Sequence, residues 1–128
     1  MRRLFEEHVF RREGEYWTMI YGRQTVRLRD GAGLRYLAAL IRRPGEAVHA
    51  TELRAAAAER EGTRRGRPKS TSGDRDRDRL AVTKGIKSAL ARITAAHPAL
   101  GGHFAATLRC GYQCRYLPDP RHPIRWVE

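Results

Sequence analysis

Residues 25–53, TVRLRDGAGLRYLAALIRRPGEAVHATEL, contain the pattern from which the fold is predicted. Apolar side chains recur there at the three- and four-residue spacing of an amphipathic helix: Leu34, Leu37, Leu40 and Ile41. Asp30 is placed to cap this helix, and Pro44-Gly45 ends it. The pattern therefore predicts one short helix that turns its apolar stripe toward a core.

A second helix is predicted directly after this one. A short extended piece, residues 46–50, leads to Thr51, whose hydroxyl is expected to cap a helix running through Leu53 and the alanines at 55–58. Two short helices joined by a tight connection are typical of the start of a helix-turn-helix.

On the amino-terminal side, residues 15–29, EYWTMIYGRQTVRLR, predict a β-hairpin. Two runs rich in β-branched and aromatic residues flank Gly22-Arg23. In the first run two sets of side chains alternate: Trp17, Met19 and Tyr21 against Tyr16, Thr18 and Ile20. This alternation indicates a hairpin with one face exposed to water.

On the carboxyl-terminal side, residues 61–79, EGTRRGRPKSTSGDRDRDR, contain no aliphatic or aromatic side chain. Such a segment buries too little apolar area to offset its ordering entropy, so we expect a flexible basic linker. A third helix is predicted to begin at Leu80 and to end near His97-Pro98, because proline disfavours helical geometry in the preceding residue. Its apolar stripe is Val82, Ile86, Ala89, Leu90 and Ile93.

A second hairpin is expected over residues 104–116, FAATLRCGYQCRY, with its turn near Gly111. The predicted fold class is α+β: a winged helix-turn-helix with an N-terminal β-hairpin or sheet, three helices and a C-terminal hairpin wing. We expect one domain over residues 1–128. Its parts are the hairpin with the first two helices (15–60), the linker (61–79), the third helix with the wing (80–117) and the tail (118–128).

Three segments resemble the DNA-binding output domain of OmpR-like response regulators: residues 25–53, LAVTKGIKSALARI and ATLRCGYQC. In that family the third helix enters the major groove and a Thr-Val-Arg-x-x-Gly-Tyr hairpin forms the wing. The matching residues, with one residue fewer before the glycine, are Thr107, Leu108, Arg109, Gly111 and Tyr112. The chain is also similar to winged-helix segments of bacterial signalling ATPases. The resemblance implies a DNA-binding bacterial transcriptional regulator.

If the third helix is the recognition helix, its first turns should meet base edges. The candidates for base and phosphate contacts are Arg77, Arg79, Thr83, Lys84, Lys87 and Ser88. The wing candidates are Arg109, Tyr112, Gln113 and Arg115. Gly85 costs this helix roughly 1 kcal/mol relative to alanine. It indicates a close approach either to DNA or to another helix.

The linker contains a motif that resembles an AT-hook, RRGRPKS. Its candidate minor-groove residues are Arg64, Arg65, Gly66, Arg67, Pro68 and Lys69. Two arginines can enter a narrow groove of enhanced negative potential, the glycine avoids a clash with the groove floor, and the proline keeps the chain extended. Such an element adds affinity and a preference for A·T pairs without defining a long site.

Composition restricts the partners. The net charge is +12 and the sequence pI is about 10.9, which favours a polyanion such as nucleic acid. A solvated, arginine-rich surface is the plainer explanation. No apolar run approaches the roughly 20 residues that span a bilayer, so we expect a cytoplasmic, nucleoid-associated protein with no membrane partner. No catalytic motif is visible, and we expect neither an enzyme nor a cofactor.

Other binding modes also fit these sequence features. The basic face of the winged helix can also dock an acidic partner such as RNA polymerase or a signalling ATPase. A further alternative is an architectural nucleoid protein that binds DNA without sequence preference. A homodimer on repeated half-sites is a further alternative. The aromatics near the ends, Phe5, Phe10 and Trp126, either complete the core or form a dimer contact.

Cys110 and Cys114 flank the predicted wing tip, with His97 and His103 upstream. The spacing does not match the usual zinc-finger arrangement, so we expect no metal site. The two cysteines suit facing positions in a hairpin, where they pack as small apolar groups. A disulfide, and with it a wing that responds to oxidation, remains the alternative.

Overall fold

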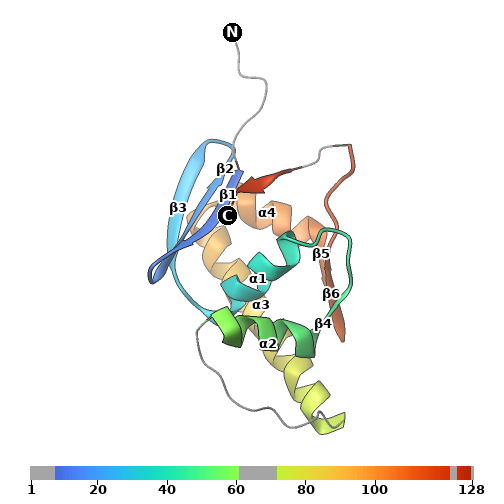
Figure 1. Ribbon diagram of the computed structural model, residues 1–128. Helices are drawn as coiled ribbons and strands as arrows, with labels where there is room; N and C mark the ends of the chain where they lie inside the picture. The colour runs from blue at the N-terminus through green and yellow to red at the C-terminus, as the bar shows by residue number, and fades with distance from the viewer. Residues whose placement is uncertain (1–7, 61–71, 122–123, 128) are drawn as a thin grey trace.

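The computed structural model describes residues 8–60, 72–121 and 124–127. Over these residues the chain forms seven strands and four helices (Figure 1): β1 (His8–Glu13), β2 (Tyr16–Tyr21), β3 (Gln24–Arg29), α1 (Ala32–Ile41), β4 (Val48–His49), α2 (Ala50–Arg60), α3 (Ser72–Ala96), α4 (Pro98–Thr107), β5 (Leu108–Cys110), β6 (Gln113–Tyr116) and β7 (Trp126–Val127). The helices lie between two small sheets. The fold is therefore α+β, as expected.

The N-terminal sheet has the strand order β3-β2-β1-β7. Its predicted hairpin is confirmed, since β2 and β3 pair antiparallel around Gly22-Arg23, whose φ angles are 58° and 72°. Positive φ at both turn residues gives a two-residue turn the twist that matches its strands. Trp17 and Met19 point into the core, while Tyr16 on the opposite face is exposed. The sequence pattern does not predict β1, which pairs antiparallel with β2.

The predicted first helix is confirmed as α1, and its apolar stripe is buried. The expected cap is wrong, because Gly31 and not Asp30 occupies the N-cap position. The Asp30 carboxylate instead accepts hydrogen bonds from Trp17 Nε1 (2.8 Å) and Arg35 Nε (3.2 Å), and it forms an ion pair with Arg12 (2.9 Å). A buried donor without an acceptor costs more free energy than a helix end that can bond to water. The Asp30 carboxylate therefore points toward Trp17 and Arg35 and not toward the helix end.

Two glycines allow α1 and α3 to cross closely. A methyl group on Gly33 would overlap the backbone carbonyl of Gly85. One on Gly85 would lie 3.0 Å from the ring of Tyr36. Gly85 is therefore needed for the approach of another helix, which decides between the two explanations that the sequence leaves open.

α2 begins at Ala50, and the expected cap from Thr51 is wrong. The Thr51 backbone N–H donates to Nδ1 of His49 (3.2 Å), so a histidine takes the capping role. The Thr51 hydroxyl is buried and makes no hydrogen bond within the described part of the chain.

α3 begins at Ser72, eight residues before the predicted start, so the prediction of a linker over all of residues 61–79 is wrong from 72 onward. The alternating charges support these helical turns through an ion pair between Asp76 and Arg79 (3.4 Å) and one between Asp78 and Arg54 of α2 (3.2 Å). The helix ends at Ala96, as predicted from His97-Pro98. Residues 61–71, with the motif that resembles an AT-hook, lie outside the described residues.

α4 is a fourth helix that the sequence does not predict, and it corrects the expected start of the second hairpin from residue 104 to Leu108. Pro98 occupies its first turn, and the His97 side chain caps it by accepting a hydrogen bond from the backbone N–H of Leu100. The hairpin turns at Gly111, as predicted. β6 also pairs with β4, which gives the second sheet the order β4-β6-β5.

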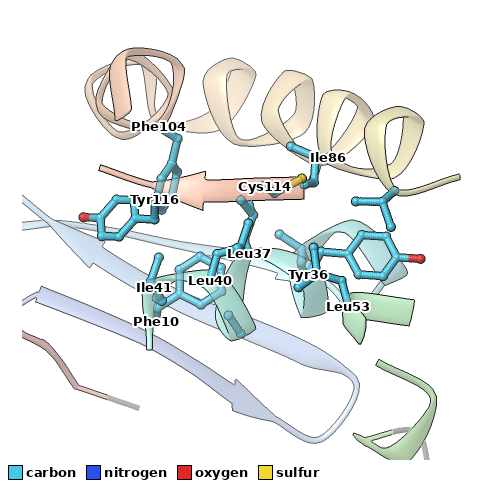
Figure 2. Close-up of a cluster of buried hydrophobic side chains, with 14 of the residues drawn as sticks. Phe10, Tyr36, Leu37, Leu40, Ile41, Leu53, Ile86, Phe104, Cys114 and Tyr116 are labelled. Carbon is cyan, nitrogen blue, oxygen red and sulfur yellow. The ribbon is translucent and has the colours of Figure 1, made fainter. Parts of the chain in front are cut away.

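The core lies where α1, α3, α4 and the inner face of the N-terminal sheet meet. Figure 2 shows Leu37 and Leu40 of α1 among Phe10, Phe104 and Tyr116, all of which are buried. The tail returns to this core, because β7 pairs in parallel with β1. The indole of Trp126 stacks near Phe104 with centroids 5.9 Å apart. Phe10 and Trp126 thus complete the core, whereas Phe5 lies outside the described residues.

Candidate nucleic-acid interface

The outer face of α3 carries most of the predicted contact residues. Lys84, Lys87 and Ser88 are exposed on the side opposite the buried stripe, whose members are Val82, Ile86, Ala89 and Ile93. Thr83 is half-buried at the boundary, and Arg77 is exposed two turns before Lys84. In Figure 1 the N-terminal turns of α3 extend beyond α2 at the bottom of the view. The helix therefore presents a long basic face to solvent.

Arg79 lies differently from the other candidates, because it packs against the tip of the β5-β6 hairpin. Its guanidinium carbon lies 4.9 Å from the centroid of the Tyr112 ring. The Tyr112 hydroxyl donates to Asp76 Oδ1 (3.1 Å), which also pairs with Arg79. Two α3 side chains thus hold the hairpin tip. We assign Arg79 first to positioning the hairpin against the helix.

The candidate wing residues Arg109, Tyr112, Gln113 and Arg115 are all exposed. Arg109 and Arg115 occupy directly opposite positions on β5 and β6. The Arg109 guanidinium donates to the carbonyl oxygens of Leu108 (2.8 Å) and Ala106 (3.3 Å). Like charges at facing positions destabilise a strand pair.

Cys110 and Cys114 occupy facing positions in the hairpin, as expected, with Cα atoms 4.1 Å apart. They are joined by a disulfide and are therefore not merely packed as free thiols. Cys114 is fully buried in the core and Cys110 is exposed. The disulfide encloses the three tip residues, and the Tyr112 carbonyl accepts from the N–H of Ala50 (3.0 Å). The tip is thus attached to α2 as well as to α3.

The two histidines upstream of the hairpin make hydrogen bonds within the fold. His97 donates from Nε2 to the Tyr21 carbonyl (2.8 Å), and His103 Nε2 lies 2.8 Å from the Tyr116 hydroxyl. Burial, with a smaller contribution from His8, lowers the pKa of His103 below its usual value, so its ring stays neutral at pH 7. No cluster of three metal-ligating side chains occurs among the described residues.

Sequence reasoning misses three residues at this interface. Asp76 and Asp78 look like spacers in an alternating charge run, yet they bind the hairpin tip and α2. Leu80 is expected at the start of the helix but not on its outer face, where its side chain is 58% exposed. Only helical periodicity extended back through residues 76–79 would have placed the three together.

Comparison with protein-family models, with curated proteins and with solved structures finds no match to this chain. Within the described residues, no helix combines the length and the apolar character that crossing a membrane requires.

Proposed function

We propose that the chain is a winged helix-turn-helix protein that binds double-stranded DNA, acting as a bacterial transcriptional regulator at the cytoplasmic nucleoid. The observation that carries this proposal is the basic outer face of α3 beside the hairpin tip. Lys84 and Lys87 point away from the core there. The major groove of DNA, about 12 Å wide, admits a helix of this kind.

Strand pairing supports the winged-helix part of the proposal. The strand between α1 and α2 pairs with the C-terminal hairpin, so the hairpin is attached beside the two helices and next to α3. A wing held in this way reaches the DNA backbone while the recognition helix occupies the groove. α4 departs from the expected winged helix, because it inserts ten residues between the recognition helix and the wing.

The wing supplies phosphate contacts in this proposal. Arg109 and Arg115 face each other on its exposed surface, and a phosphate between or beside them removes their mutual repulsion. Residues 64–69 add minor-groove contacts from the segment that joins α2 to α3. Two weak sites on one chain raise each other's effective concentration, so the combined affinity exceeds that of either.

The test is fluorescence-anisotropy binding to A·T-rich, G·C-rich and random duplexes across a salt series, with heparin and an acidic peptide as polyanion controls. We expect duplex-dependent binding that weakens steeply with salt, because each neutralised phosphate contributes a slope of about −0.9. Changing Arg65 and Arg67 together to Ala should weaken A·T-rich binding more than G·C-rich binding.

The matched variants remove two positive charges from different faces. The pair Lys84→Gln and Lys87→Gln should reduce the salt slope by about 2. The control pair, Arg27→Gln and Arg29→Gln, removes the same charge from exposed positions of β3 and should change the slope little. Equal losses in the two variants would contradict the assigned face. Heparin or peptide binding as tight as duplex binding would favour an acidic protein partner instead.

A further inference from the structure

Leu80 is the most exposed large hydrophobic side chain among the described residues, at 58%. It lies on the outer face of α3, one turn before Lys84 and three residues after Arg77. The next large apolar residue of the helix, Val82, is fully buried, whereas Leu80 contributes little to the core. The helix therefore holds an apolar group between Asp76 and Arg77 on one side and Lys84 and Lys87 on the other.

Single exposed leucines are common on protein surfaces, and exposure alone carries no function. The side chains around Leu80 restrict the chemical class of partner that could contact it. Arg77 precedes it, and Lys84 and Lys87 follow it at one-turn and two-turn spacing on the same face. Tyr112, 56% exposed, contacts Asp76 one turn before Leu80. A complementary partner is polyanionic and offers an apolar group between its charges.

Duplex DNA meets that description in the major groove. Phosphates line both edges of the groove, and the C5-methyl of thymine is the apolar group on its floor. We infer that Leu80 reads the thymine methyl group in the major groove and makes A·T pairs a determinant of the site. This inference rests on the proposed DNA binding, with the outer face of α3 as the recognition face.

Major-groove and minor-groove preferences for A·T pairs are separable by chemistry. Replacing thymine with uracil deletes the C5-methyl and leaves the minor-groove acceptors unchanged. A preference that comes from residues 64–69 alone is therefore unaffected by the replacement. A preference that comes from Leu80 is lost.

The experiment compares an alternating A·T duplex with its deoxyuridine counterpart, using the full chain and fluorescence anisotropy. We expect the wild type to bind the thymine duplex about fourfold more tightly for each contacted methyl group. Leu80→Ala should bind both duplexes with nearly equal affinity. Leu117→Ala, which truncates another exposed leucine, should keep the wild-type ratio. Any effect of uracil on duplex stiffness is common to all variants and cancels in this comparison.

Each contrary outcome has its own meaning. Equal wild-type affinity for both duplexes, with the salt slope intact, overturns the role of Leu80 and leaves DNA binding standing. A thymine preference that survives in Leu80→Ala overturns it too. Sedimentation separates these outcomes from a dimer contact. If the wild type self-associates and Leu80→Ala does not, while the ratio of thymine to uracil duplex affinities is unchanged, Leu80 is a dimer contact and the inference is overturned. Absence of duplex binding at low salt removes the proposed function itself.

Discussion

The C-terminal part of α3 packs through apolar contacts, whereas its N-terminal turns are held by polar side chains. From Val82 onward, the apolar stripe is buried in the core, and Gly33 and Gly85 let α1 and α3 cross closely. Between Asp76 and Arg79, the contacts are ion pairs and a tyrosine hydroxyl at the protein surface. Burial of apolar area is worth more than exposed ion pairs, so the two parts of one helix should differ in stability.

A mutation of Asp30 tests whether the burial of a contact, rather than its polarity, determines how much it stabilises the fold. Asp30→Ala should cost roughly 3–5 kcal/mol, since it leaves Arg35 buried without its carboxylate. Denaturant unfolding monitored by the fluorescence of Trp17 and Trp126 measures the loss. A cost below that of breaking the exposed Arg54–Asp78 pair would contradict the comparison.

The same carboxylate predicts a pH dependence. Burial acts to raise the pKa of Asp30, but hydrogen bonds from Arg35 and Trp17 and the charges of Arg35 and Arg12 outweigh it, and the pKa lies below its usual value. A depressed folded-state pKa stabilises the protein above the unfolded pKa, about 4, and this stability is lost as pH falls through the folded value. Asp30→Asn should therefore flatten the stability profile below pH 4.

Gly33→Ala tests the apolar part of α3. Its added methyl would meet the backbone of Gly85, which cannot rotate away, so we expect a loss of about 3 kcal/mol. Gly102→Ala in α4 is the control, because nothing lies within 4 Å of its added methyl. That control should gain about 0.5–1 kcal/mol from helix propensity. Equal effects at the two sites would mean that the helices can separate at little cost.

Reduction of the disulfide tests the polar part. A dithiol should loosen the hairpin tip that holds Asp76 and Arg79, at a cost of at most about 2 kcal/mol for so small a loop. Hydrogen exchange should quicken at residues 76–79 and stay slow at 86–93. Cys110→Ser should show the faster exchange without reductant and no response to it. Uniform acceleration along α3 would show that the helix is one cooperative unit.

The Arg54–Asp78 pair should have the smallest effect. Arg54 is largely solvent-accessible, so a double-mutant cycle with Arg54→Gln and Asp78→Asn should give a coupling of about 0.2–1 kcal/mol. Salt should reduce that coupling. Coupling that survives 1 M salt would mean that this contact is better buried than its exposure indicates.

Much of the candidate interface follows from periodicity. Lys84, Lys87 and Ser88 are found because they lie opposite an apolar stripe, a relation that any helix of this sequence keeps. Arg79 and Asp76 are not found, because their partner is Tyr112, more than 30 residues away. Leu80 is predicted as the first residue of the third helix. Its exposure is not predicted, because it depends on which elements pack against that side of the helix.

The sequence by itself determined the β2-β3 hairpin, α1, the apolar part of α3 and the turn at Gly111. Each depends on local backbone preference or on alternation of apolar and polar side chains, which hold wherever the core lies. Tertiary structure decided the role of Asp30, the start of α3, the helix α4 and the return of β7 to β1. These depend on which polar groups and strand edges meet, and a hydrogen bond or a strand pair gains free energy only from a partner that folding brings near.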